Sequence, residues 1–190
     1  MKFILASASP RRRELLEMLN IAPLEIVPAQ GEERPEAGRS GAETAAMLSR
    51  AKAREVAARR DADDVVIAAD TVVWLDGRLF GKPKDTGDAA RMLRALSGRA
   101  HTVYTGVTVM RGGEAVTETE ATEVRFRELA DAEIEAYIAT GEPMDKAGAY
   151  GAQGKGALFV EGITGDFFNV MGLPLCRLGK MLRHMGVSLL

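Results

Sequence analysis

The sequence predicts an α/β fold in which helices flank a mixed sheet, and three observations indicate it. Apolar runs of strand length alternate along the chain with segments that carry a helical apolar stripe. Gly112-Gly113 separates two long strand-like segments and so indicates an antiparallel hairpin, whereas strands joined by helices favour parallel pairing. The composition marks no linker between independent domains. We therefore expect residues 1–190 to form a single domain.

The first half of the chain is expected to begin with a short strand and a capped helix. Ser9-Pro10 supplies an N-cap and a proline at the first helical position. Residues 65–69 are apolar without alternation, which favours a strand buried on both faces. The elements expected here are, in order, a strand at 3–6, a helix from Pro10, a strand at 24–27, a polar loop at 28–40, a helix at 41–60, and strands at 65–69 and 72–75.

The second half is expected to hold three helices and the hairpin. Asp85 is placed to cap a helix that Ser97-Gly98 ends, and Gly141 ends a later helix. The elements expected here are, in order, a helix between Asp85 and Ser97, strands at 101–110 and 115–126, a helix ending at Gly141, a glycine-rich loop, a strand near 158–160, and a last helix at about 174–185.

Composition and charge exclude several classes of protein. The 190 residues suffice for a packed core without a disulfide or zinc, because a chain of this length buries roughly 70% of its unfolded surface. Cys176 is the one cysteine, so an intramolecular disulfide and a thiolate metal cage are excluded. We expect Cys176 to be a small buried hydrophobe. A net charge of -2 argues against nucleic acid as a partner.

The sequence offers no segment suited to a membrane or to secretion. The longest run without Asp, Glu, Lys or Arg covers residues 100–110 and is too short to span a bilayer. Residues 1–6 are also too few for the apolar region of a secretory signal. We therefore expect a cytoplasmic protein that makes no membrane contact.

The first candidate site is the basic turn Arg11-Arg12-Arg13 at the start of a predicted helix. Helix N-termini favour anions, so each cation there costs on the order of 0.3–1 kcal/mol. Backbone N–H groups, arginine forks and the hydroxyls of Ser7 and Ser9 converge at this point, which favours a phosphate cradle; a solvated basic turn is the alternative. On the dipole argument, Arg12→Ala should leave folding stability unchanged or slightly improved.

Two further residues break the local pattern. Lys52 falls on the face of the predicted helix at 41–60 that should be buried, where an ammonium either extends to solvent or meets an anion. Asp70 directly follows the buried run 65–69, near the carboxyl end of that strand, where ligands bind in open α/β sheets. A carboxylate there holds a metal or orients water in one interpretation and closes a turn in the other.

The segment 145–156 is rich in glycine, with four glycines in its last nine residues, which permits close backbone approach to a ligand. Its spacing is not that of a P-loop, and a strand rather than a helix is expected after it. A flexible surface loop is the alternative. Lys82, in Gly81-Lys82-Pro83, and the pair Glu32-Glu33 would by default face solvent.

Seven segments along the chain share one order with a known family: Leu5-Ala6-Ser7-Ala8-Ser9-Pro10-Arg11-Arg12, Lys52-Ala53, Ala69-Asp70-Thr71, Gly81-Lys82-Pro83, Leu96-Ser97-Gly98, Asp145-Lys146-Ala147-Gly148-Ala149-Tyr150 and Val170-Met171-Gly172-Leu173-Pro174. In this order they resemble the Maf (septum-formation-inhibitor-like) nucleoside triphosphate pyrophosphatases. The segments cover nearly the whole chain, so the resemblance is far more specific than one short motif.

The resemblance implies an elongated, two-lobed α/β fold similar to inosine triphosphate pyrophosphatases, with the nucleotide in a central cleft. It also implies hydrolysis between the α and β phosphates, which releases a monophosphate and pyrophosphate and uses a divalent cation, Mg²⁺ or Mn²⁺. Arg11, Thr71 and Gln153 match the group that acts on dTTP and UTP, with modified pyrimidine nucleotides left open. The Gln153 amide has a donor and an acceptor that suit a uracil or thymine edge.

The resemblance also implies a role for each candidate residue. Asp70 would be the catalytic carboxylate and would share the metal with Glu33, for which the adjacent Glu32 is the alternative. The residues that would bind the triphosphate are Ser7, Ser9, Arg12, Lys52 and Lys82.

The alternative function is a nucleotide-binding regulator of cell division that acts through partner proteins. Such a regulator would need the cleft but not a competent Asp70, so the presence of both carboxylates favours the enzyme. The sequence does not indicate an oligomeric state, and a homodimer is one of the alternatives.

Overall fold

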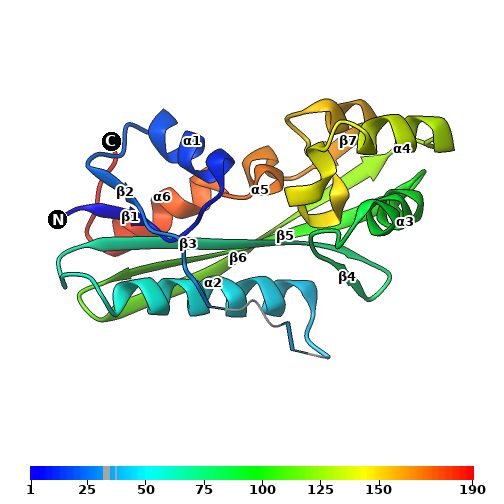
Figure 1. The fold of residues 1–190 in the computed structure, drawn as a ribbon. Coiled ribbons are helices and arrows are strands. Elements are labelled where there is room, and N and C mark those ends of the chain that lie inside the picture. Colours follow the sequence, from blue (N-terminus) through cyan, green and yellow to red (C-terminus); the bar gives the residue numbers. More distant parts are fainter. Residues whose placement is uncertain (32–34, 37) are drawn as a thin grey trace.

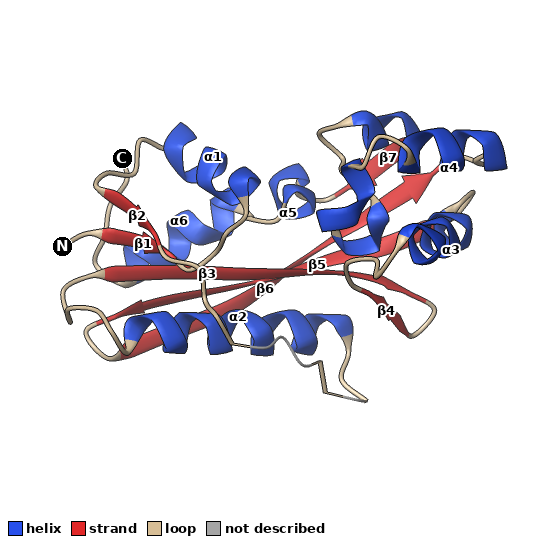
Figure 2. Cartoon of the chain, viewed as in Figure 1, coloured by secondary structure: helices blue, strands red, loops and turns tan. Residues whose placement is uncertain are grey.

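The computed structural model describes residues 1–31, 35–36 and 38–190, which form a seven-stranded mixed sheet with helices on both faces (Figures 1 and 2). This confirms the predicted α/β fold. The strands are β1 (Phe3–Leu5), β2 (Leu24–Ile26), β3 (Val65–Leu75), β4 (Arg78–Phe80), β5 (Ala100–Arg111), β6 (Glu114–Phe126) and β7 (Val160–Thr164).

Both kinds of pairing occur in the sheet, whose order is β2-β1-β3-β5-β6-β7, with β4 paired to β3. Strand β1 runs parallel to β2 and to β3, whereas β3, β5, β6 and β7 pair antiparallel in that order. The hairpin of β5 and β6 turns at Gly112-Gly113, as predicted. Strands β3, β5 and β6 extend along the length of the molecule and so connect its two ends (Figure 1).

Helix α2 (Gly41–Ala57) covers one face of the long strands, and the other helices lie on the opposite face in two groups (Figure 1). We call the group with α1 (Pro10–Met18), α6 (Leu175–His184), β1 and β2 the first lobe. The second lobe holds α3 (Thr86–Leu96), α4 (Asp131–Ile138), β4, β7 and the turns between them. Helix α5 (Phe167–Met171) lies between the lobes.

Alternation along the strands divides the apolar residues between the two faces. Phe3, Leu5 and Ile67 belong to the core beneath α1 and α6, whereas Ile4 and Val66 pack with α2. The second lobe has a separate core that includes the aromatic residues of β6 and of the glycine-rich segment. Each lobe therefore has apolar packing of its own, and the long strands run from one lobe to the other (Figure 1).

The structure differs from the predicted elements in several places. Residues 65–75 form one strand rather than two, because they pair with β5 without a break. Residues 155–159 form a 3₁₀ turn, and β7 begins only after it; neither β4 nor α5 was predicted. Cys176 is exposed, so the expectation that it is buried was wrong. None of the helices in the described part of the chain has the length and apolar character needed to span a membrane.

Candidate active site

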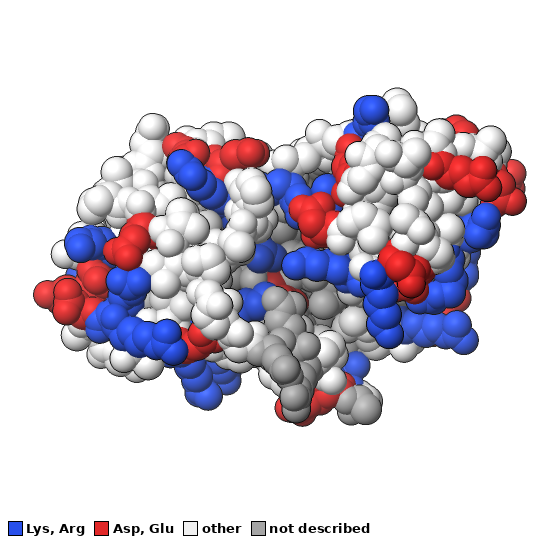
Figure 3. All heavy atoms as spheres, in the orientation of Figure 1, with Lys and Arg blue, Asp and Glu red and all other residues white. Residues whose placement is uncertain are grey.

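A cleft of about 570 Å³ lies between the two lobes, over the middle of β3. Figure 3 shows Lys and Arg side chains gathered in this hollow, with acidic side chains beside them. The volume is in the range of small-molecule sites. The cleft is lined by the segment from β1 to α1, by the middle of β3 and by the glycine-rich segment of the second lobe.

The cleft exists because one edge of β3 is open at this point. Strand β1 pairs with β3 at residues 65–67 and β4 pairs with it at residues 73–75. On that side, no described strand pairs with residues 68–72. Asp70 and Thr71 lie in this gap, inside a continuous strand. The prediction that Asp70 follows the end of its strand was therefore wrong, although Asp70 does lie just past the carboxyl end of β1.

Strand alternation directs Asp70 toward α2, the face that also receives Val66 and Ala68. There the Lys52 ammonium donates to Asp70 Oδ1 at 2.6 Å, and both side chains are largely shielded from solvent. Gly106, the partner of Asp70 on β5, allows α2 to pack closely against the sheet here, because a Cβ at Gly106 would lie 2.3 Å from the backbone of Ala45 in α2. Of the two alternatives for Lys52, the structure thus shows the one in which it meets an anion.

Alternation directs Thr71 to the opposite face, toward α1, where it contacts Arg12. The buried Arg12 guanidinium donates from Nε to the carbonyl of Gly172 at 2.8 Å, from one terminal nitrogen to Ser7 Oγ at 3.1 Å, and from the other to Thr71 Oγ1 at 3.0 Å. Thr71 Oγ1 also lies 2.9 Å from the hydroxyl of Thr105 on β5. Arg12 is therefore a fixed cation that ties β1, β3 and the end of α5 together.

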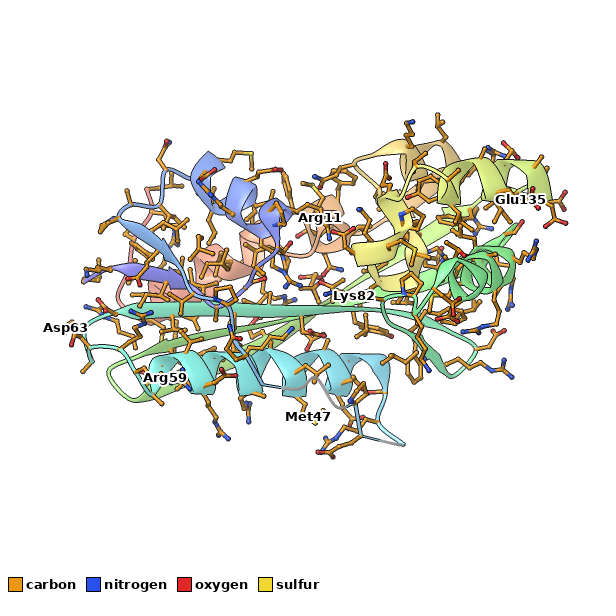
Figure 4. All side chains as sticks on the ribbon, in the orientation of Figure 1. Arg11, Met47, Arg59, Asp63, Lys82 and Glu135 are labelled. Carbon is orange, nitrogen blue, oxygen red and sulfur yellow. The ribbon has the colours of Figure 1, made fainter. Side chains whose placement is uncertain are left out.

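The opposite wall of the cleft is built from the second lobe and carries mixed charge. Arg11 lies at the inner end of α1 (Figure 4) and bonds Asp145 Oδ2 across the cleft at 3.2 Å. Lys146 bonds the other oxygen of Asp145 at 2.6 Å. Burial alone would raise the pKa of Asp145, but its bonds to Lys146 and Arg11 outweigh this and lower the pKa.

Tyr150 and His101 support this wall from behind. Tyr150 lines the cleft at the start of the glycine-rich turn, and its hydroxyl lies 2.8 Å from His101 Nε2 on β5. Burial lowers the pKa of His101 to about 4, so the ring is neutral at pH 7. Tyr150, which lies within the glycine-rich segment, is therefore held in place by its bond to His101.

A family model described as "Maf-like protein" matches residues 2–185. The chain belongs to the Maf family. It is 51% identical to a dTTP/UTP pyrophosphatase of Bacillus cytotoxicus (96% of this chain, 95% of that protein), 52% identical to one of Thermococcus gammatolerans (98% of each), and 53% identical to one of Moorella thermoacetica (98% and 96%).

Solved structures of other proteins share the Maf chain's fold. The HAM1 protein of Coxiella burnetii superposes with a TM-score of 0.52 at 16% identity and covers 97% of this chain and 99% of its own. The Staphylococcus aureus Ham1 protein has the same TM-score at 14% identity, with 97% and 100% covered. At these identities the similarity concerns the fold alone, and it confirms the fold class that the sequence predicts.

The structure brings nearly all predicted site residues of this Maf protein to one cleft. Lys82 lies across the cleft from Arg11, on the edge of the second lobe (Figure 4), and Gln153 lies in an exposed turn of the same lobe. Glu33 and its alternative Glu32 lie outside the described residues. The predicted residues that line the cleft are Ser7, Ser9, Arg11, Arg12, Lys52, Asp70, Thr71, Lys82 and Gln153.

Three features of the Maf cleft were not predicted. Ser9 has the backbone conformation of an N-cap, but its side chain makes no capping bond. Asp145 and Lys146 line the cleft, although the sequence suggested only a glycine-rich loop there. Arg12 is buried and makes three bonds to described residues, so we expect its loss to lower stability rather than leave it unchanged. The helix dipole concerns α1 alone, whereas these partners of Arg12 lie outside that helix.

Proposed function

We propose that this Maf protein is a nucleoside triphosphate pyrophosphatase that hydrolyses dTTP and UTP to the monophosphate and pyrophosphate, and that it works as one domain with two lobes. The curated relatives, about half identical over nearly the whole chain, carry this name. The observation that carries the proposal is the Lys52–Asp70 pair at the base of a cleft lined by cations. A carboxylate at this position can orient the water that attacks the phosphorus, and the cations can bind the phosphate groups of the substrate.

The residues proposed for the reaction lie on the two opposite faces of β3, beside its open edge. Asp70, which is paired with Lys52, orients the water that attacks the α-phosphorus or accepts a proton from that water. Arg12 and Ser7, held together at 3.1 Å, present a cation and a hydroxyl to the phosphates, and Lys82 provides a second cation from the opposite rim. These contacts neutralise charge that grows on the pyrophosphate as it leaves.

Among the described residues, no cluster of three or more His, Cys, Asp or Glu side chains could hold a metal, so a divalent cation would depend on Asp70 together with ligands from outside that set. Mg²⁺ is usually held by one or two carboxylates together with substrate phosphates and water, and Mn²⁺ prefers the same oxygen ligands. Asp70 offers a shielded carboxylate inside the cleft, and Glu33 is the second acid that the resemblance implies. When bound, the cation would supply charge neutralisation on the triphosphate.

The base would lie toward the second lobe, near Gln153. A uracil or thymine edge offers an N3–H donor flanked by carbonyl acceptors, which the Gln153 amide can match with one acceptor and one donor. Arg11 and Thr71 would limit the size of the base by narrowing the cleft from the first lobe and from β3. Gln153 is exposed in the structure, so its amide discriminates between bases only to the extent that the bound base shields it from water.

The test is pyrophosphate release from a panel of nucleoside triphosphates with Mg²⁺ or Mn²⁺. We expect turnover of dTTP and UTP well above that of CTP, ATP and GTP, with one pyrophosphate and one monophosphate formed per substrate. Release of inorganic phosphate without pyrophosphate would contradict the proposed reaction. Tight nucleotide binding without turnover under either metal would instead indicate the regulator that the sequence left as an alternative.

A further inference from the structure

The turn that carries Gln153 is held from behind by one carboxylate, that of Glu142. Glu142 follows α4 in the second lobe and is not among the described residues that line the cleft. Its Oε2 accepts the backbone N–H of Lys155 at 3.0 Å, and its Oε1 accepts that of Gly156 at 3.2 Å. Two backbone amides that follow Gln153 in the sequence are therefore fixed by the Glu142 side chain.

The part of the turn that precedes Gln153 is linked to the Glu142 carboxylate through Tyr137. The Tyr137 hydroxyl donates to Glu142 Oε1 at 2.8 Å and accepts the backbone N–H of Gly151 at 3.1 Å. Burial of Tyr137 and its bond to Glu142 raise the pKa of the phenol, so the hydroxyl keeps its proton and can act as donor. Both ends of the short segment that contains Gln153 thus lead to one carboxylate.

The glycines of the turn fit closely around this carboxylate. A Cβ added at Gly154 would lie 2.5 Å from Glu142 Oε1, and one at Gly151 would lie 2.7 Å from the Lys146 side chain. Lys146 in turn donates to the backbone carbonyl of Glu142 at 2.7 Å. Close contact with Lys146 and Glu142 therefore explains the glycines at 151 and 154.

Burial of Glu142 would raise the pKa of its carboxyl, but the backbone N–H groups and the Tyr137 hydroxyl outweigh this and lower the pKa. The carboxylate form, which accepts all three bonds, is therefore the form that is present at neutral pH. A glutamine has nearly the same shape but offers one acceptor oxygen in place of two.

We propose that Glu142 is a positioning residue that fixes the Gln153 amide against the base and so sets the preference for uracil and thymine. This inference rests on the proposed function, because it assumes that Gln153 contacts the base. Glu142 acts without touching the substrate, through the backbone of the turn. Its loss should therefore change the discrimination between bases more than it changes hydrolysis itself.

The experiment compares Glu142→Gln with Glu135→Gln, a matched control that removes one charge from the exposed side of α4, far from the cleft (Figure 4). The readout is the ratio of kcat/KM for UTP to that for CTP. We expect Glu142→Gln to lower this ratio at least about fivefold, mainly through KM for UTP, and Glu135→Gln to leave it within about twofold. An unchanged ratio in a folded Glu142→Gln protein would overturn the proposal.

A double-mutant cycle with Gln153→Ala separates positioning from a general structural effect. If Glu142 acts through Gln153, adding Glu142→Gln to Gln153→Ala produces no further fall in the UTP:CTP ratio; independent, multiplying effects would contradict it. If Gln153→Ala alone leaves the ratio unchanged, the base-reading part of the proposed function is wrong. If it lowers the ratio while Glu142→Gln does not, only the positioning inference fails.

Tyr137→Phe provides a second test if Glu142→Gln does not fold. It keeps the ring, which packs edge-on against Phe159, and removes only the hydroxyl that links Gly151 to Glu142. We expect a smaller fall in the same ratio, about two- to threefold, with kcat for UTP nearly retained. A fall in kcat for every nucleotide at constant ratio would overturn the proposal.

Discussion

The two walls of the cleft are built in different ways. In the first wall, Ser7, Arg12, Lys52, Asp70 and Thr71 lie on or beside β1, α1, α2 and β3 and bond one another directly, side chain to side chain. In the second wall, the turn with Gln153 has no strand or long helix of its own. Its backbone is held by the side chains of Glu142 and Tyr137.

This difference matches the precision that each wall needs. Groups that orient a water and hold phosphates must be fixed within fractions of an ångström, and regular elements with locked side chains achieve this. A turn at the other end of the sheet, which we propose reads the base, can change without disturbing those groups. Under the proposed function, reaction and selectivity are therefore separable, and the following substitutions test how far.

The largest effect is expected at the first wall, from Asp70→Asn. The change keeps the shape of the side chain but removes the charge that pairs with Lys52, so we expect turnover to fall at least about 10³-fold. Nucleotide binding should survive, since the other cleft residues are unchanged. Pyrophosphate release and equilibrium binding measure the two effects, and Asp63→Asn, on an exposed turn far from the cleft (Figure 4), is the control. Comparable turnover of Asp70→Asn and wild type at saturating nucleotide and metal would remove Asp70 from catalysis.

Arg12→Ala should weaken the first wall in both stability and activity. Loss of the bonds that the buried guanidinium makes to Gly172, Ser7 and Thr71 leaves Gly172 O without this donor, and we expect a loss of about 2–4 kcal/mol in the free energy of unfolding. Arg13→Ala is the matched control, because Arg13 lies in the same helical turn but pairs with Glu17 on the surface, where the loss of stability should be much smaller. Equal denaturation midpoints for the two variants would show that Arg12 has no special structural role.

Lowering the pH should destabilise the protein through His101, which lies behind the second wall. The folded pKa of His101 is lowered to about 4, below its unfolded value, so as the pH falls the unfolded chain takes up a proton that the folded chain does not. From this group alone we expect a loss of about 2 kcal/mol in the free energy of unfolding between pH 7 and pH 5.

Urea unfolding at both pH values measures this loss. His101→Gln, which keeps a polar group beside Tyr150, should show a smaller pH dependence, whereas His184→Gln, at an exposed position on α6, should behave as wild type. A pH dependence that is the same in wild type and His101→Gln would rule out this source of acid sensitivity.

The smallest effect is expected from Gln153→Glu, which changes the second wall alone. A carboxylate would face a carbonyl oxygen of the base, while the N3–H contact could survive, so kcat/KM for dTTP and UTP should fall at least about tenfold, or about 1.4 kcal/mol. Activity on CTP and GTP should fall less, which makes these nucleotides the internal control. If the ranking of UTP, dTTP, CTP and GTP does not change, Gln153 does not read the base.

The walls also differ in how well the sequence predicted them. Arg11, Arg12 and Asp70 were singled out because they break local rules, as cations at a helix N-terminus and a charge after a buried run, and all three line the cleft. Glu142 breaks no local rule, since an acid after a helix and before a proline is ordinary at the surface. Its role depends on amides nine to fourteen residues further along the chain, which no local pattern shows.

The sequence by itself determined the mixed α/β fold and the hairpin at Gly112-Gly113, because periodicity and turn residues are local properties, and its family resemblance indicated most of the residues around the cleft. The tertiary structure alone decided that Asp70 lies inside β3, at an edge left open between β1 and β4. It also decided that Asp70 and Thr71 point to opposite faces and so meet Lys52 and Arg12. Those partners are separated from them by 18 and 59 residues, and the packing of α2 and α1 against the sheet, not local propensity, brings them together.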